Sequence, residues 1–363
     1  MIAVFLVLGL ALLVWGGEWL VRGASRLAAG FGISPLIIGV TIVAFGTSMP
    51  EMVVSTKAAW VGQADIALGN VIGSNIFNVL FILGLCALVA PLVVAQQLVR
   101  IDVPIMIGVS LLLWALALDN HLGRLDGAIL FAGIVTYTVM AIRKSRQESA
   151  AVAQEYAQEF PPPKPGRSTK SVLVNIGFIL AGLVLLVLGA RWLVDSAVTI
   201  ARSWGVSEFV IGLTIVAAGT SLPEVATSII ATIRGERDIA IGNVVGSNIF
   251  NMLGILGATC LIAPHGVAVS PAALSFDIPV MTAVAVACLP VFFTGHTIAR
   301  WEGGMFLSFY VAYTAYLVLA AQQHDALPAF SAVMLWFVIP LTAVTLAVVL
   351  ARQLRARKRA PGR

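Results

Sequence analysis

A duplication inside the chain constrains its fold more than any other feature. Segment 39–84 recurs without a gap at 212–257, so each residue of the first copy is matched 173 positions later. Within Asp65–Gly84, 16 of 20 positions are identical in the second copy. Both copies set a glutamate, glycines and amides among apolar residues. The chain is therefore expected to fold as two similar halves, each built around one copy.

Composition places these halves in a membrane. Hydrophobic residues make up 60% of the chain and charged residues 11%, with a mean hydropathy of +0.99. Apolar runs long enough to cross a bilayer as helices follow one another, which predicts an all-α polytopic membrane protein. The first run, Ile2–Leu20, lacks a basic leader and is predicted to be a span rather than a cleaved signal. About eleven spans are expected, at 2–21, 36–59, 65–90, 102–118, 125–143, 171–194, 207–232, 238–262, 276–294, 301–321 and 329–351.

The spans divide into two repeats of five. IDVP at position 101 matches FDIP at position 276, and RLDG at 124 matches RWEG at 300. An odd number of helices per repeat makes the two copies enter the membrane from opposite sides, which is an inverted repeat. We assign a first repeat to 1–143, a proline-containing cytoplasmic linker to 144–170 and a second repeat to 171–321. Residues 322–363 add an eleventh helix and a basic tail.

The positive charge follows the same topology. With the N-terminus outside and the C-terminus in the cytoplasm, 18 of the 22 lysines and arginines lie inside. Only Lys57, Arg124, Arg191 and Arg202 remain outside, which agrees with the positive-inside rule. The net charge of +5 therefore indicates membrane orientation and not a nucleic-acid partner. A prokaryotic inner (plasma) membrane is expected, and the sequence gives no oligomeric state.

A helix break is predicted in each copy. In GTSMPE at 46–51, Gly46 loosens the helix and Pro50 removes a backbone donor. Irregular backbone at membrane depth persists only where it lines an enclosed site. In the alternative interpretation, Ser48 and Glu51 form a capping box and have only a structural role.

A polar stripe follows each break. Asn70, Ser74 and Asn78 repeat every four residues, and Asn243, Ser247 and Asn251 match them. Glycines 69 and 73, matched by 242 and 246, would let another helix approach closely. Interhelical hydrogen bonding is the alternative role for the asparagines, chiefly Asn70, Asn75, Asn243 and Asn248. Asn78 and Asn251 are expected nearest the glutamates.

Together these segments offer only hard oxygen ligands. Such sets suit Ca²⁺ or Na⁺, and two carboxylates neutralise one divalent ion. No cofactor is expected beyond the transported Ca²⁺ and Na⁺ as bound ions. The candidate metal ligands are Glu51, Glu224, Thr47, Ser48, Thr220, Ser221, Ser74, Ser247, Asn78 and Asn251.

Charged residues outside this set are given structural roles. Asp65 and Asp238 are predicted to be helix N-caps, with ion entry as the alternative. Glu18 and Arg22, matched in opposite order by Arg191 and Asp195, are predicted to pair at the membrane interface.

Through GTSMPE…GNVIGSNIFN and GTSLPE…GNVVGSNIFN the chain resembles the cation/calcium antiporter superfamily, specifically the prokaryotic sodium/calcium exchangers. The resemblance covers the first ten helices and implies four clustered ion sites, with Glu51 and Glu224 as the main calcium ligands. It implies that Thr47, Ser48, Thr220, Ser221, Ser74, Ser247 and Asn78 complete the calcium and sodium positions. It also implies that helices 1 and 6, with Gly16, Gly17 and Gly189, slide across the core. Asn251 stands where several relatives have aspartate, which leaves K⁺ cotransport open.

The sequence thus predicts a secondary antiporter that exchanges Na⁺ for Ca²⁺ by alternating access and catalyses no covalent reaction. A Ca²⁺/H⁺ antiporter, in which the glutamates carry protons, is the first alternative. A cation channel comes next, although broken helices in inverted halves favour alternating access. A purely structural membrane scaffold is the last.

Overall fold

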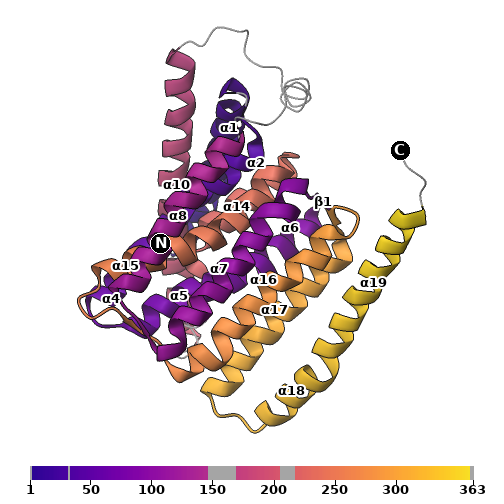
Figure 1. The fold of residues 1–363 in the computed structure, drawn as a ribbon. Helices are drawn as coiled ribbons and strands as arrows, with labels where there is room; N and C mark the ends of the chain where they lie inside the picture. The colour runs from indigo at the N-terminus through magenta and orange to yellow at the C-terminus, as the bar shows by residue number, and fades with distance from the viewer. Residues whose placement is uncertain (1, 32, 146–168, 205–216, 360–363) are drawn as a thin grey trace.

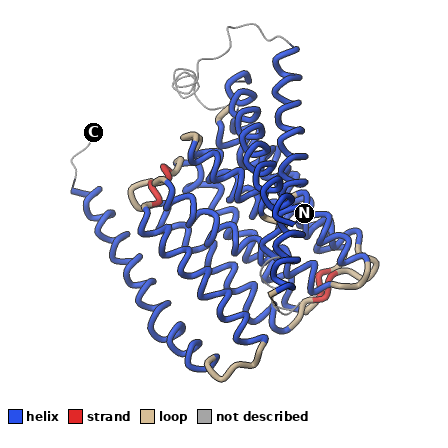
Figure 2. Tube along the Cα trace, turned by 180° about the vertical axis from the view of Figure 1, so that it is seen from behind, coloured by secondary structure: helices blue, strands red, loops and turns tan. Residues whose placement is uncertain are grey.

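The computed structural model describes residues 2–31, 33–145, 169–204 and 217–359. Within these ranges the chain is almost entirely helical, as expected (Figures 1 and 2). In the first half the elements are α1 (Ile2–Phe31), α2 (Pro35–Ile38), η1 (Gly39–Val43), α3 (Ala44–Thr47), α4 (Met49–Trp60), α5 (Ala64–Phe77), η2 (Asn78–Leu83), α6 (Gly84–Val89), β1 (Leu92–Val93), η3 (Leu98–Asp102), α7 (Val103–Leu116), η4 (Ala117–Asp119), β2 (His121–Leu122) and α8 (Arg124–Ser145).

The second half repeats this order. Its elements are α10 (Thr169–Ser203), α12 (Ala217–Gly219), α13 (Leu222–Ile233), α14 (Arg237–Phe250), η6 (Asn251–Ile255), α15 (Leu256–Ile262), β3 (Val267–Ala268), η7 (Ala273–Asp277), α16 (Ile278–Phe293), β4 (Thr297–Ile298) and α17 (Arg300–Ala321), followed by α18 (Leu327–Val333), η8 (Met334–Val338) and α19 (Ile339–Arg359). η4 is a 3₁₀ turn and the other η elements are π-helical turns.

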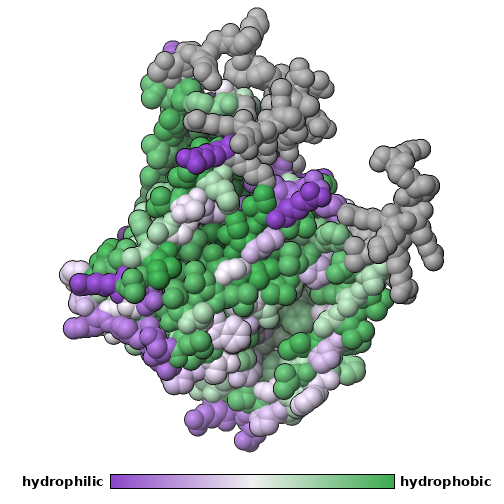
Figure 3. Space-filling view, viewed as in Figure 1, coloured by the Kyte–Doolittle hydropathy of each residue, from purple (hydrophilic) through white to green (hydrophobic). Residues whose placement is uncertain are grey.

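The described residues contain nine helices long and apolar enough to cross a bilayer, or ten with the bent pair Pro35–Thr47 and Met49–Trp60. The predicted count of eleven is not confirmed, because part of the expected span 207–232 lies outside the described residues. Most of the predicted linker 144–170 lies outside them too. Figure 3 shows hydrophobic residues covering most of one face, with hydrophilic residues gathered toward its two ends, as a membrane protein requires.

Two short antiparallel ladders tie the halves together. β1 pairs with β4, with Leu92 opposite Ile298, and β2 pairs with β3, with Leu122 opposite Val267. Each ladder therefore joins a strand of one half to a strand of the other. This crossed pairing holds the two halves as one core.

α1 and α10 form a close antiparallel pair. A Cβ at Gly16 would lie 2.8 Å from the Gly182 carbonyl oxygen, and one at Gly189 would lie 2.7 Å from that of Gly9. Both helices are longer than the predicted spans 2–21 and 171–194, which were wrong at their ends. α1 continues because Ala24, Leu27 and Ala28 keep one face buried. The pair extends beyond the other helices (Figure 1).

The helices that carry the polar stripes are the most enclosed. In the most apolar 18 residues of Ala64–Val89, 78% of the residues are buried inside the protein. In the corresponding part of Arg237–Ile262, 83% are buried. α19, in contrast, runs along the outside of the bundle (Figures 1 and 2). α1 and α10 belong to a smaller hydrophobic cluster, apart from the main one, that also includes Ile38, Val43, Ala231 and Ile239 of the broken and stripe helices. The stripe residues are therefore buried, apart from the half-buried Asn70.

Candidate functional site

Both copies of the repeat break their helix at the predicted place. The helix through α3 ends at Thr47, α4 begins at Met49, and the axes differ by 45°. Ser48 lies at the break with φ −84° and ψ 8°, and Ser221 in the second copy has φ −89° and ψ 9°. Prolines at the next-but-one position, Pro50 and Pro223, end the preceding hydrogen-bond pattern. About 20 Å of helix lies on either side of Ser48, so the break is near the middle of the span.

The two glutamates lie at one site and are held by reciprocal hydrogen bonds. Ser48 Oγ donates to Glu224 Oε1 at 2.8 Å, and Ser221 Oγ donates to Glu51 Oε1 at 2.8 Å. Both carboxylates are buried, with residue exposures of 1% for Glu51 and 0% for Glu224. Neither serine side chain caps its own helix, so the capping-box alternative is wrong. Each broken helix instead positions the acid of the opposite half.

Asparagines form a second layer across the same interface. Asn78 Nδ2 donates to Asn248 Oδ1 at 3.1 Å, and Asn251 Nδ2 donates to Asn75 Oδ1 at 3.0 Å. Asn75 and Asn248 also donate to each other's backbone carbonyl, at 3.4 and 3.2 Å. The predicted interhelical bonding by Asn75 and Asn248 is therefore confirmed, and it joins the two halves.

Several oxygens at this interface have no hydrogen-bond partner among the described residues. They are Oε2 of Glu51 and Glu224, Oδ1 of Asn78 and Asn251, and Oγ of Ser247. Leaving a buried acceptor unpaired costs about 1–3 kcal/mol, and more for a charged group. Carboxylate, amide and hydroxyl oxygens such as these are the ligand types that a hard cation binds. The donor set therefore fits the predicted Ca²⁺ or Na⁺ cargo.

The remaining predicted ligands surround this group. Thr47 and Thr220 directly precede the two break serines, and Thr47 is fully buried. Ser221 Oγ lies 3.2 Å from Ser74 Oγ. All ten candidate residues thus belong to the broken helices or to the stripes that pack against them. Helix approach at Gly242 and Gly246 is confirmed, since backbone atoms of Leu36 and Val40 would contact their Cβ atoms. At Gly69 and Gly73, nothing among the described residues lies within 4 Å of a Cβ.

Two features of the site were not predicted. Asn78 and Asn251 each begin a π-helical turn, which recurs at functional sites in other helices. The local sequence carries no signal for it. The predicted N-caps Asp65 and Asp238 are wrong: Gln63 and Glu236 occupy the cap positions, and both aspartates lie in the first helical turn, where a negative charge favours the helix dipole.

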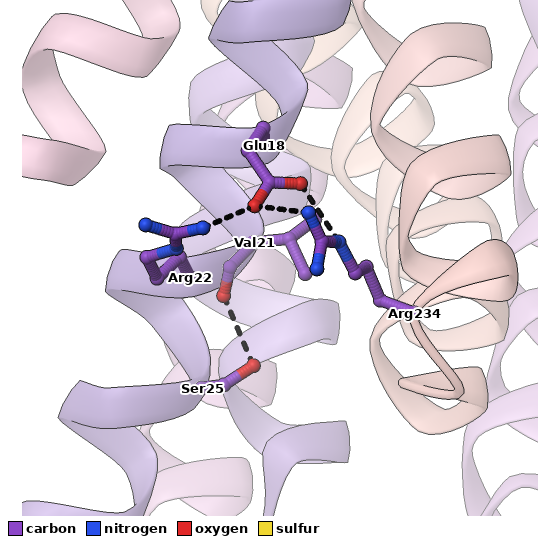
Figure 4. Close-up of polar contacts among 5 residues, drawn as sticks. All are labelled: Glu18, Val21, Arg22, Ser25 and Arg234. Carbon is purple, nitrogen blue, oxygen red and sulfur yellow. Dashed lines mark hydrogen bonds and ion pairs between the residues drawn. The ribbon is translucent and has the colours of Figure 1, made fainter.

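An ion-pair cluster attaches α1 to α13 away from the centre (Figure 4). Glu18 Oε1 lies 2.6 Å from Arg22 Nη2 and 2.6 Å from Arg234 Nη2, and Arg234 Nε donates to Glu18 Oε2 at 2.8 Å. The predicted pairing of Glu18 with Arg22 is confirmed. Arg234 was missed because it comes from the other half of the chain.

Comparison with known families identifies this arrangement. The sequence model of the family described as "Sodium/calcium exchanger protein" matches residues 1–143 and 174–319, which is most of the chain. The chain belongs to the sodium/calcium exchanger family. This exchanger is accordingly a multi-pass membrane cation/calcium antiporter and not an enzyme.

Its curated relatives match over most of their length. The exchanger is 44% identical to a putative antiporter CaxA of Alkalimonas amylolytica over 79% of this chain and 88% of the relative. It is 39% identical to the inner membrane protein YrbG of Escherichia coli, over 77% and 85%. The sodium/calcium exchanger MaX1 of Methanosarcina acetivorans is 32% identical, over 86% and 97%.

Solved structures of the sodium-calcium exchanger NCX_Mj share the fold. One of them, soaked with Na⁺ and Sr²⁺, superposes with a TM-score of 0.74 at 29% identity and covers 86% of this chain and 97% of that one. The predicted all-α exchanger architecture is thereby confirmed.

Proposed function

We propose that this exchanger moves Ca²⁺ out of the cell against Na⁺ entering down its gradient, through one shared site opened alternately to either side. The ligands in this proposal are Glu51, Glu224, Asn78, Asn251 and the break and stripe hydroxyls named above. The single observation that carries it is the set of five buried, unpartnered oxygens drawn from both halves. Two carboxylates would balance one Ca²⁺, and the hydroxyls and amides would serve Na⁺ when Ca²⁺ leaves.

Alternating access is supported by the packing around the site. The main hydrophobic cluster joins residues of both halves, while α1 and α10 pack into a second cluster with residues of α13 and α14 such as Ala231 and Ile239. In this proposal the α1/α10 pair slides over the core and exposes the site first to one side and then to the other. The N-terminus lies outside and the C-terminus in the cytoplasm of a prokaryotic inner membrane, supported by the lysine and arginine distribution.

Proton coupling is the second candidate. It is supported by the two buried glutamates themselves, because intramembrane carboxylates also serve as proton carriers in transporters. In that case Glu51 and Glu224 would take up protons in place of Na⁺, while the other oxygens would serve Ca²⁺ alone.

The test is ⁴⁵Ca²⁺ uptake into sealed proteoliposomes. One set is loaded with NaCl and diluted into Na⁺-free buffer at equal pH, and a matched set carries only a pH gradient. We expect uptake in the first set and not in the second, and empty liposomes give the background. Uptake driven by the pH gradient alone would mean that H⁺, and not Na⁺, is the counter-ion. Uptake without either gradient would indicate a channel. K⁺ added to the external, Ca²⁺-containing buffer tests K⁺ cotransport separately.

A further inference from the structure

Asn70 and Asn243 make the same three contacts in the two halves. Asn243 Nδ2 donates to Ser228 Oγ at 3.0 Å and to the Glu224 carbonyl oxygen at 3.5 Å. Its Oδ1 accepts from Thr47 Oγ1 at 3.1 Å. Each asparagine therefore links the glutamate helix of its own half to the break threonine of the other.

The contacts of Asn70 follow the same pattern. Its Nδ2 donates to Ser55 Oγ at 2.9 Å and to the Glu51 carbonyl oxygen at 3.3 Å. Its Oδ1 accepts from Thr220 Oγ1 at 3.3 Å. Because both amide hydrogens of each asparagine have acceptors, the amide orientation is fixed and its oxygen must face the threonine.

The threonine hydroxyl has one proton and more than one acceptor within reach. Besides Asn243 Oδ1, Thr47 Oγ1 lies 3.1 Å from the Val43 carbonyl oxygen and 3.4 Å from that of Ala44. A proton given to Asn243 leaves both hydroxyl lone pairs free to accept, and the Ala44 carbonyl still accepts from Ser48 N–H at 3.1 Å. A proton given to the backbone would tie up a carbonyl and leave the buried Asn243 oxygen without its donor.

We propose that Asn243 and Asn70 are positioning residues that fix the hydroxyl protons of Thr47 and Thr220, so that the threonine oxygens are presented to the cation as acceptors. This inference rests on the proposed function of the site as a cation carrier. It assigns the asparagines an effect on ion affinity that acts through the threonines, in addition to interhelical bonding.

A double-mutant cycle tests whether the effect acts through the threonine. The purified exchanger is titrated with CaCl₂ and, separately, with NaCl by calorimetry, for wild type, Asn243→Leu, Thr47→Val and the double variant. We expect Asn243→Leu to weaken binding of at least one cation by roughly 10-fold. In the Thr47→Val background, the same change should weaken it by less than about 2-fold, because the hydroxyl on which it acts is gone.

The matched control exchanges the partners. The effects of Asn243→Leu and Thr220→Val should multiply, since Thr220 donates to Asn70 and Thr47 to Asn243. Asn70→Leu should couple to Thr220→Val. Ser228→Ala, which only loosens the Asn243 amide, should weaken binding by about 2- to 3-fold and lose this effect with Thr47→Val. It serves as the probe if Asn243→Leu does not fold.

Two results would overturn the inference. The first is that the fold-changes in cation affinity caused by Asn243→Leu and Thr47→Val simply multiply in the double variant. The second is that Asn243→Leu lowers the melting temperature without changing cation affinity. Either result would mean that Asn243 has only a helix-packing role. Failure of the proposed function looks different, because wild type would then bind neither Ca²⁺ nor Na⁺ in the same titrations.

Discussion

The two halves of the molecule match at the centre and differ where α1 and α10 meet the core. At the centre, Ser48 holds Glu224 and Ser221 holds Glu51, both at 2.8 Å. Near the surface, α13 is followed by Arg234, which binds Glu18 of α1. The matching helix α4 is followed by Val61, 173 positions earlier, in a turn of the same shape at Gly62 and Gly235. An uncharged Val61 cannot form an ion pair.

This difference indicates that the two regions have different functional requirements. A site that faces alternate sides in turn needs equivalent ligands from both inverted halves. Contacts that hold α1 and α10 against the core need not be equivalent, because they set how stable each orientation is. Variants made at matched positions can test this comparison.

The largest effect is expected at the glutamates. Glu51→Gln and Glu224→Gln each retain an acceptor for the partner serine but remove one of two charges from a buried site. Loss of one such charge costs about 2–5 kcal/mol, so Na⁺-driven ⁴⁵Ca²⁺ uptake should fall at least about 30-fold in both variants. Near-normal exchange in either, at unchanged expression and melting temperature, would remove that half from the site.

The sequence predicts the features of this centre that depend on local residues, and not those that depend on contacts between the halves. The duplicated GTS-x-PE segments predict both helix breaks, because Pro50 and Pro223 act on their own turns. The bond from Ser48 to Glu224 spans 176 positions and depends on how the halves dock, so the local motif suggested a capping box instead. The π-helical turns at Asn78 and Asn251 also depend on packing.

The same reasoning explains the errors in the fold. Hydropathy ended α1 near Arg22, but the helix continues because its buried face is set by contact with α10. Crossed pairing of β1 with β4 and β2 with β3 involves strands of two residues, too short to leave a pattern in sequence. Arg234 looked like an ordinary cytoplasmic charge until α1 was placed beside it.

The glycine contacts between α1 and α10 should be the next most sensitive. Gly16 and Gly189 are matched positions, and a Cβ on either would come within 2.8 Å of a facing backbone oxygen. Gly16→Ala and Gly189→Ala should each destabilise the protein by roughly 1–3 kcal/mol, measured as a lower melting temperature in detergent. Gly177→Ala on α10 is the control, because its Cβ meets nothing within 4 Å. A loss as large in Gly177→Ala would show that close packing is not the cause.

A smaller and again equal effect is expected at the asparagines. Asn78→Ala and Asn251→Ala each remove one unpartnered oxygen and one bond to the opposite half. Apparent Ca²⁺ affinity should weaken by about 10-fold in each, as judged from half-saturation of exchange. If only one of the two variants changed Ca²⁺ affinity, the halves would contribute unequally and the central match would be only geometric.

The smallest effect is expected at the surface ion pair, where the halves differ. Glu18 is 19% exposed and Arg234 55% exposed, so Arg234→Gln should cost only a few tenths to about 1 kcal/mol. Because the bond joins α1 to α13, its loss should still alter how readily α1 moves. We expect Arg234→Gln to change the exchange rate at saturating ions by about 2- to 5-fold while leaving Ca²⁺ affinity unchanged. Arg22→Gln is the matched control, since Arg22 pairs with Glu18 within α1 alone. Equal exchange rates in wild type and both variants would mean that the Glu18–Arg234 ion pair does not affect access to the site. If Arg234→Gln changes the rate and the combination of Glu18→Arg with Arg234→Glu restores it, the effect is due to this one ion pair.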